Sequence, residues 1–167
     1  MEHNSQTARM LHDEHMEEVA VLERLESVLH THKITEPPST EDTIIHSMLA
    51  DVISSVDEQV NHHFVFEEEH LFPKLTELGE GGIGEFLKSE HRMIRETGGA
   101  VLEIARDAKE NGFNAENWKN FHHAGRELIE WVVGHVQKEE MGLLPLVEQI
   151  IEEDDDMELA EAYMACR

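Results

Sequence analysis

One motif that pairs an imidazole with a carboxylate occurs twice in the chain. His63–Pro73 reads HFVFEEEHLFP and His135–Pro145 reads HVQKEEMGLLP, so both fit the pattern H-x-x-x-E-E-x-x-L-(F/L)-P. Residues four apart in an α-helix lie about one turn apart on the same face, so each copy presents a histidine beside a glutamate. Two such pairs at matching positions predict metal ligands that point into a shared interior.

The repetition includes a second, shorter string upstream of each motif. Leu11–His15 reads LHDEH and Leu87–His91 reads LKSEH, with Leu four residues and Glu one residue before the histidine in both. The repeating unit is therefore a helix with one histidine, a connection, and a helix with H-x-x-x-E. An internal repeat of this kind fixes the architecture of the chain.

Four long helices are expected to position these residues. Apolar residues at helical spacing accompany His15, and Pro37-Pro38, the glycine-rich run 79–84 and Asn111-Gly112 interrupt the helical pattern. The predicted helices cover about 6–30, about 40–78, about 85–110 and, beginning after the capping residue Asn114, a stretch that ends near 153.

The predicted fold class is all-α, an antiparallel up-down-up-down four-helix bundle with an internal two-fold helix-pair repeat and a short C-terminal helix. All 167 residues are expected to form a single domain. The bundle is predicted over about 6–153, and an acidic linker with a tail helix over 154–167. Tyr163, the only tyrosine, falls in that tail, so no core tyrosine is expected near the histidines.

Charge and composition exclude several classes of partner and site. The formal net charge is −24 at pH 7, which repels nucleic-acid phosphates and anionic membrane surfaces. No apolar run approaches the ~20 residues needed to span a bilayer, and the first residues show no signal-peptide core. A cytoplasmic location is therefore expected. The single cysteine, Cys166, provides neither an internal disulfide nor a cysteine metal site.

Six side chains form the predicted metal site. Imidazoles and carboxylates in a bundle core are heavily penalised without partners, and bound cations offset that penalty. Four nitrogen and two oxygen ligands are too many for one ion with an open position, so they suit two ions bridged by carboxylates. This donor set fits iron, manganese or zinc, and the absence of thiolate disfavours Cu(I) and iron–sulfur clusters. The predicted ligands are His15, His63, Glu67, His91, His135 and Glu139.

Two further H-x-x-x-E matches are not predicted to be ligands. His32 and Glu36 fall in an expected loop, and His123 and Glu127 lie on a different face of their helix from His135. Neither match continues as E-x-x-L-(F/L)-P, which sets both apart from the duplicated motif.

Several neighbours leave alternatives open. Glu68 and Glu140 follow the predicted glutamate ligands directly, and they are alternative ligands, partners of the ligands, or solvated groups. His12 is the alternative to His15, and its position in the other repeat is occupied by a lysine. His70 shares a helix face with His63 and is a candidate for a supporting contact.

The ordered pattern H, H-x-x-x-E, H, H-x-x-x-E over four helices resembles the hemerythrin-like, HHE cation-binding family. The resemblance covers about 8–149, and its characteristic strings are the E-H pairs near the helix starts and H-x-x-x-E-E-x-x-L-F-P. It implies a non-haem di-iron centre with an oxo or hydroxo bridge, able to bind O2, NO or peroxide.

The chain departs from the oxygen-carrying hemerythrins at two positions. Those proteins place a further histidine four residues after the third-helix histidine, where this chain has Arg95. They also end with H-x-x-x-x-D, whereas here Glu139 stands at the fourth position and Glu140 at the fifth. The loss of one imidazole leaves a position for water or peroxide, which favours oxidation chemistry, NO chemistry or sensing over reversible oxygen carriage.

The predicted function is to bind, sense or turn over O2, peroxide or NO at two iron ions, with manganese or zinc as substitutes. Binding or sensing is favoured over a peroxide- or NO-linked oxidoreductase activity. The alternative is iron storage, delivery or iron-centre repair without catalysis. Repair proteins of the family usually carry an added N-terminal cysteine-bearing domain, which these 167 residues do not contain. A signalling module that recruits a protein partner through the tail helix is a third candidate.

Overall fold

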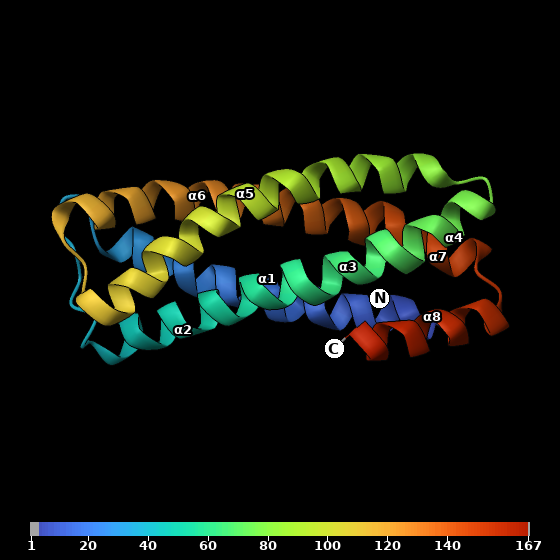
Figure 1. Cartoon of the computed structure of the whole chain (residues 1–167), viewed down its shortest axis with the longest axis horizontal. Helices are drawn as coiled ribbons and strands as arrows, with labels where there is room; N and C mark the ends of the chain where they lie inside the picture. The colour runs from blue at the N-terminus through green and yellow to red at the C-terminus, as the bar shows by residue number, and fades with distance from the viewer. Residues whose placement is uncertain (1–3, 167) are drawn as a thin grey trace. The chain divides into compact units, whose positions relative to one another are not determined.

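Every regular element in residues 4–166, the part of the chain that this computed structural model describes, is a helix (Figure 1). The predicted all-α class is confirmed, and the up-down-up-down order stays a prediction. The elements include three π-helical turns, labelled η. They are α1 (Gln6–Thr31), α2 (Thr43–Glu58), η1 (Gln59–His63), α3 (Phe64–Phe66), η2 (Glu67–Leu71), α4 (Phe72–Glu77), α5 (Gly81–Asn111), α6 (Ala115–Lys138), η3 (Glu139–Leu143), α7 (Leu144–Ile150) and α8 (Glu153–Cys166).

The chain divides into two compact units. Unit 1 consists of Met1–Glu17, Glu58–Arg92 and Gly134–Arg167, and unit 2 consists of Glu18–Asp57 and Met93–Val133. All six predicted ligands belong to unit 1, so the site is built inside one unit. The single-domain assignment stays a prediction.

Unit 1 has an apolar core to which the C-terminal helix contributes. Tyr163 of α8 is only 5% exposed and meets Phe66 edge-on, with ring centroids 5.2 Å apart. Tyr163 therefore enters the apolar core of unit 1, because α8 packs against α3. The buried cluster comprises Ala8, Leu11, Phe66, Leu71, Phe72, Leu75, Leu87, Leu143, Leu144, Val147, Leu159 and Tyr163.

Unit 2 encloses a separate set of buried residues that includes Trp118 and Phe121. The Trp118 indole N–H donates to the Lys33 carbonyl oxygen over 2.9 Å, which ties α6 to the loop that follows α1. The predicted cap is confirmed at the start of α6, where Asn114 Oδ1 accepts the backbone N–H groups of Glu116 and Asn117.

The glycine-rich run does less to break the chain than its composition suggests. Only Leu78, Gly79 and Glu80 lie between α4 and α5, and Gly79 has a φ of +87°, which favours glycine. Gly81 and Gly84 are already helical. A Cβ atom at Gly84 would lie 2.9 Å from Phe72 side-chain atoms, so this glycine permits close packing of α5 on α4.

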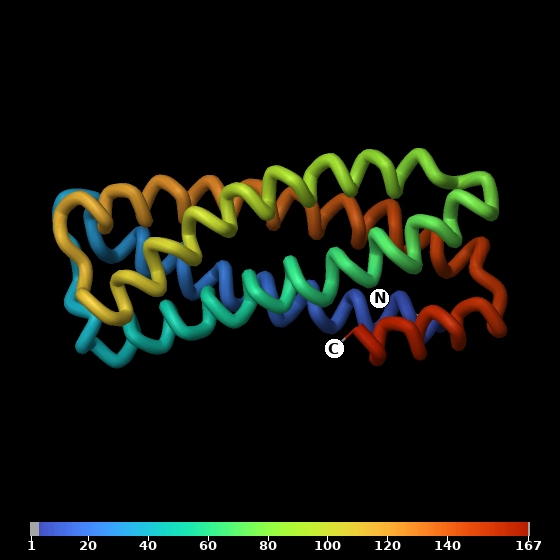
Figure 2. The backbone as a smooth tube through the Cα atoms, in the orientation of Figure 1, coloured from blue at the N-terminus to red at the C-terminus, as the bar shows by residue number. Residues whose placement is uncertain are grey.

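π-helical turns replace α-helical geometry directly before the two repeated prolines. The N–H of Phe72 bonds to the Glu67 carbonyl and the N–H of Leu144 to the Glu139 carbonyl, five residues back in each case. The proline that follows has no N–H, and its ring would clash with a carbonyl of a regular α-helix. The wider turn accommodates it, and the backbone path of 58–77 continues without interruption (Figure 2). The sequence predicted uninterrupted helices over both stretches, about 40–78 and from Asn114 to near 153.

The acidic run near the C-terminus is not a linker. Residues 153–156 form the first turn of α8, where carboxylates interact favourably with the helix dipole. Asp156 accepts the backbone N–H groups of Gln6, at 2.7 Å, and Thr7, at 3.0 Å, and the Ser5 hydroxyl, at 2.7 Å. It therefore caps α1, which a run of like charges does not predict.

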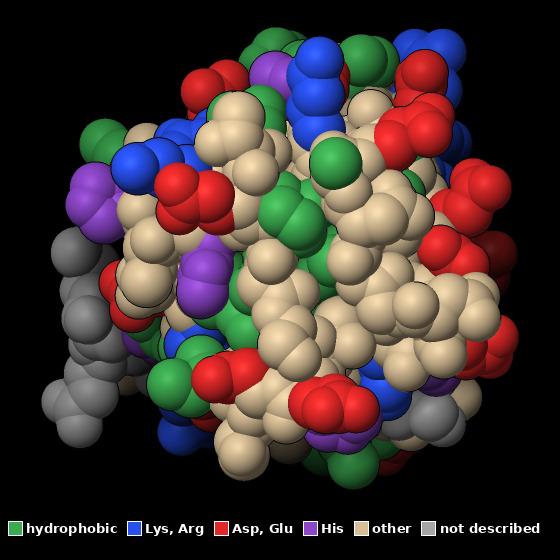
Figure 3. All heavy atoms as spheres, turned by 90° about the vertical axis from the view of Figure 1, so that its left-hand side faces the viewer, with side chains coloured by type: hydrophobic (Ala, Val, Ile, Leu, Met, Phe, Trp, Pro, Cys, Tyr) green, Lys and Arg blue, Asp and Glu red, His purple; other side chains and the backbone are tan. Residues whose placement is uncertain are grey.

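The visible face in Figure 3 carries acidic side chains with lysine and arginine side chains between them. None of the helices between residues 4 and 166 combines the length and the apolar character that a bilayer crossing requires.

Candidate metal centre

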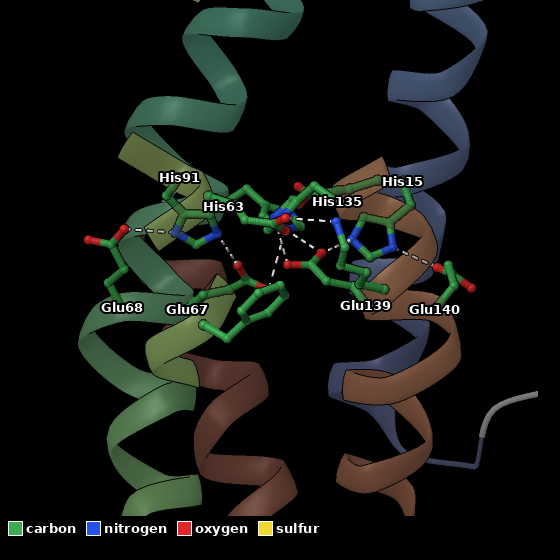
Figure 4. Close-up of polar contacts among 12 residues, drawn as sticks. His15, His63, Glu67, Glu68, His91, His135, Glu139 and Glu140 are labelled. Carbon is green, nitrogen blue, oxygen red and sulfur yellow. Dashed lines mark hydrogen bonds and ion pairs between the residues drawn. The ribbon is translucent and has the colours of Figure 1, made fainter. Parts of the chain in front are cut away.

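All six predicted ligands come together in the interior of unit 1 (Figure 4). Five of them are fully buried and His63 is 4% exposed. Each lies on a different stretch of helix or π turn, so the repeat in the sequence becomes a cluster in space. The contributing elements are α1 (His15), η1 (His63), η2 (Glu67), α5 (His91), α6 (His135) and η3 (Glu139).

The ligand atoms form two groups that share one carboxylate. Glu67, His91, His135 and Glu139 form the first group, and His15, His63 and Glu139 form the second. Within each group the ligand atoms lie within 4.8 Å of one another. Each group could hold a metal ion, and Glu139 belongs to both.

Each buried carboxylate approaches imidazoles from more than one helix. The Glu139 oxygens lie 2.8 Å from His135 Nε2 and 2.8 Å from His15 Nε2. The Glu67 oxygens lie 3.2 Å from His91 Nε2 and 3.5 Å from His63 Nε2. Each of these glutamates therefore contacts one histidine from each ligand group.

Eight buried atoms at the centre have no hydrogen-bond partner among the described residues. Unpartnered buried polar atoms are rare because each loses its hydration without compensation. Here they face one another across short distances, which is the arrangement of a metal-ligand set. The atoms are Nε2 of His15, His63, His91 and His135, and both carboxylate oxygens of Glu67 and Glu139.

The other nitrogen of every clustered imidazole is held by an outer glutamate. Because Nδ1–H donates to a carboxylate, the lone pair of the neutral ring is at Nε2, which faces the cluster. This tautomer is the one that binds metal through Nε2. The four bonds are His15 to Glu140 (2.6 Å), His63 to Glu14 (2.8 Å), His91 to Glu68 (2.7 Å) and His135 to Glu90 (3.1 Å).

These outer carboxylates follow the sequence repeat. Glu68 and Glu140 occupy matching positions after the buried glutamates, and the structure makes them hydrogen-bond partners of ligand histidines. Glu14 and Glu90 also match each other, and sequence reasoning missed their role. The duplicated E-H pairs were the available signal, but each glutamate serves the histidine of another helix and not its own neighbour.

The remaining candidates lie outside the two ligand groups. His12 Nδ1 is 2.9 Å from a Glu140 oxygen, and His12 belongs to neither ligand group. His70 stacks near Phe66 at 6.1 Å. His123 and Glu127 are exposed and belong to unit 2, which agrees with their exclusion from the ligand set.

Aromatic rings close the cluster on one side. Phe64 stacks on His91, with centroids 3.7 Å apart and planes 13° apart, and meets His135 edge-on at 5.7 Å. Phe72 lies 5.8 Å from His91. These contacts fix the orientation of the imidazole rings and keep water from their faces.

In the absence of metal ions, the pKa values of three clustered histidines are raised, so the cluster favours added positive charge. Burial lowers the pKa of His15, but the contacts of its ring with the carboxylates of Glu139 and Glu140 outweigh it and raise the pKa to about 9. Burial likewise opposes charging of His63 and His135, yet the neighbouring carboxylates raise both pKa values. Protons can therefore occupy the place of metal ions.

The buried carboxylates show the complementary effect. Burial disfavours the charged form of Glu139, but His135, His15 and His63 hold its pKa well below the ordinary value. The pKa of Glu67 is also lowered, because His63 and His91 outweigh both burial and repulsion from Glu139. Two ionised carboxylates thus persist side by side in the interior.

The comparison with known proteins agrees with this geometry. The family model of the hemerythrin HHE cation binding domain matches residues 6–158, which include all six clustered ligands. A search of curated proteins found no match. Because the family model covers most of the chain, the protein belongs to the hemerythrin HHE cation-binding domain family.

Proposed function

We propose that this chain holds two iron ions at the six clustered side chains and uses them to bind O2, peroxide or NO. The observation that carries the proposal is the set of eight buried, unpartnered atoms divided into two groups that share Glu139. Bound cations would offset the cost of burying these atoms without partners.

The donor set fits iron. Imidazole nitrogen with carboxylate oxygen is a donor combination of non-haem iron, and manganese or zinc are the substitutes that it also accepts. Bound iron would supply reversible redox chemistry and open coordination positions for a small ligand. The group of His15, His63 and Glu139 offers three donors, fewer than the other group, so open positions are expected there.

The chain itself would orient the ligands and exclude water. The four outer glutamates hold the imidazoles in the tautomer that presents Nε2, and Phe64 and Phe72 cover the His91 ring. A small diatomic molecule or peroxide fits so enclosed a centre better than a bulky substrate does. Binding or sensing is therefore the favoured role, ahead of turnover.

The test is metal content together with a spectrum. The full chain, supplied with Fe²⁺ and purified aerobically, should carry about two irons and show near-ultraviolet charge-transfer bands that change with peroxide or NO. Glu139→Ala should lose most of the metal, whereas Glu127→Ala, the exposed glutamate of the single motif match, should retain it. Far-ultraviolet circular dichroism shows that both variants are folded.

Three outcomes separate the candidates. Iron bound without any spectral response to peroxide or NO, and exchanged rapidly with chelators, would favour storage or delivery. Stable zinc or manganese in place of iron would change the metal assignment. A clean, folded protein with no bound metal would overturn the proposal.

A further inference from the structure

One of the four outer carboxylates has a second histidine on its solvent side. Glu140 accepts the buried His15 Nδ1–H through one oxygen, and its other oxygen lies 2.9 Å from His12 Nδ1. The His12 side chain is 26% exposed and that of Glu140 is 22% exposed, whereas that of His15 is 1% exposed. Glu140 lies at an outer edge of the cluster in Figure 4. His12, Glu140 and His15 therefore form a polar path from the surface to the centre.

We propose that His12 and Glu140 form a transit site, where a divalent cation binds as it enters or leaves the metal centre. The inference rests on the proposed function, because it requires that the buried cluster holds ions. It assigns to His12 a role that is distinct from that of the six ligands.

The spacing of the two groups suits a cation. Two ligand atoms that each lie about 2.1 Å from an ion, at right angles, are about 3.0 Å apart. The 2.9 Å between His12 Nδ1 and the Glu140 oxygen matches this separation. The 2.9 Å contact is a hydrogen bond, so an ion that replaces the shared proton requires the His12 ring or the Glu140 carboxylate to rotate, and water would complete its coordination. With only two protein ligands the ion is held weakly, as transfer requires.

The next step inward is short. Glu140 is adjacent in sequence to Glu139, and its inner oxygen is 2.6 Å from His15. His15 and Glu139 are two of the three members of the smaller ligand group. The side chains next to His12 and Glu140 on the way inward are therefore members of that group.

The other outer carboxylates are less suited to this role. Glu90 is only 9% exposed, and its free-side oxygen is 2.7 Å from the Lys138 ammonium, which repels cations. Glu14 and Glu68 are 13% and 18% exposed. Lys88 occupies the repeat position that corresponds to His12, and a charged lysine does not bind metal. The two repeats differ at this position, so the proposed transit site exists beside Glu140 and has no counterpart in the other repeat.

The experiment measures the rates of metal uptake and release in the full chain, with Co²⁺ alone as the probe. Absorption bands follow Co²⁺ uptake by chelator-treated protein and its release from the loaded protein to excess strong chelator. His12→Gln keeps a hydrogen-bond donor beside Glu140 but removes the imidazole ligand. It should slow uptake and release by the same factor, roughly tenfold, and leave the affinity unchanged. His70→Gln, another half-buried histidine of unit 1, is the control and should change neither rate.

The outcomes distinguish transit from support. Parent-like rates in His12→Gln would overturn the transit site while leaving the metal centre intact. Faster release with unchanged uptake would also overturn it, because His12 would then act on the loaded state by holding Glu140. A parent protein that bound no Co²⁺ would overturn the proposed function itself.

Discussion

Four histidines of unit 1 present the same ring nitrogen to one another because a carboxylate holds the other nitrogen of each ring. Such a contact decides which nitrogen carries the proton, and it also makes the imidazole a better metal donor. The ligand strength of this centre therefore depends on glutamates that touch no metal. At the scale of single residues, these glutamates are the most informative to change.

Glu68→Gln should weaken metal binding although Glu68 is not a proposed ligand. The amide can donate to Nδ1 of His91, which favours the tautomer whose Nε2 carries the proton and cannot bind. The expected loss of affinity is about 10- to 100-fold, measured by competition with a chelator. Glu127→Gln on the exposed face of α6 provides the comparison and should bind as the parent does. Equal affinities in the two variants would show that His91 needs no partner.

The metal-free protein should lose stability as the pH rises above 6.5. The pKa of His15 is raised from 6.5 to about 9, so protonated His15 stabilises the fold fully below pH 6.5 and this contribution is lost towards pH 9. The contribution amounts to about 3 kcal/mol. Glu67 and Glu139 have lowered pKa values, so their contribution is present above 4.5 and is lost as the pH falls. The most stable window thus lies between these limits.

Urea unfolding of chelator-treated protein at pH 6 and pH 9 measures this difference, and the metal-loaded protein is the control. Because bound ions replace the protons, the loaded protein should change much less over the same interval. A metal-free protein that is equally stable at both values would mean that His15 is not protonated in the fold.

At the scale of elements, the start of α5 shows how glycines set the distance between helices. Gly84 lies against Phe72, whose ring also approaches His91. Gly82, two residues earlier in the same helix, has open space around its Cα. Substitution of Gly84 therefore tests close packing, whereas substitution of Gly82 tests helix propensity alone.

Gly84→Ala should destabilise the protein by about 1–3 kcal/mol, because the new Cβ atom displaces Phe72. Gly82→Ala should be neutral or stabilising by up to about 1 kcal/mol, because alanine favours the helix and meets no neighbour. Chemical denaturation of both variants in the same metal state gives the comparison. A Gly84→Ala variant as stable as Gly82→Ala would show that α5 shifts freely relative to α4.

Much of this centre was predictable from local spacing. The duplicated H-x-x-x-E pairs and E-H pairs identified all six clustered residues, because each pair fits one helical turn. The roles of Glu14 and Glu90 as Nδ1 partners were not identified, because Glu14 and His63 are 49 residues apart and Glu90 and His135 are 45 apart. Contacts over such separations depend on how helices pack and leave no periodic signal.

The π turns and the cap by Asp156 were missed for related reasons. In a π turn the backbone N–H bonds to the carbonyl five residues back, and in an α turn to the carbonyl four residues back. The difference is so small that the apolar pattern before Pro73 and Pro145 predicts an ordinary α-helix. Asp156 caps a helix that begins 150 residues earlier in the chain. Its acidic neighbours favoured solvation, and only the packing of α8 in unit 1 gives that residue a partner.

At the scale of the whole molecule, folding and metal binding should be coupled. Removal of the ions leaves buried carboxylates and imidazoles facing one another, so chelation should lower the melting temperature. At metal concentrations near 1,000 times Kd, each ion adds about 4 kcal/mol, which corresponds to roughly 10 °C per ion for a chain of this size. Differential scanning calorimetry with and without chelator measures the shift. Glu139→Ala should show almost no shift, and an equal shift in that variant would place the stabilising ions elsewhere.

The outer glutamates have a consequence for how the two repeats depend on each other. Glu68 of the first repeat holds His91 of the second, and Glu140 of the second holds His15 of the first. Each repeat thus supplies a glutamate that orients a clustered histidine of the other repeat. A polypeptide cut between Gly79 and Glu80 should yield fragments that bind metal poorly when separate and recover binding when mixed, since each carries the orienting groups that the other one needs.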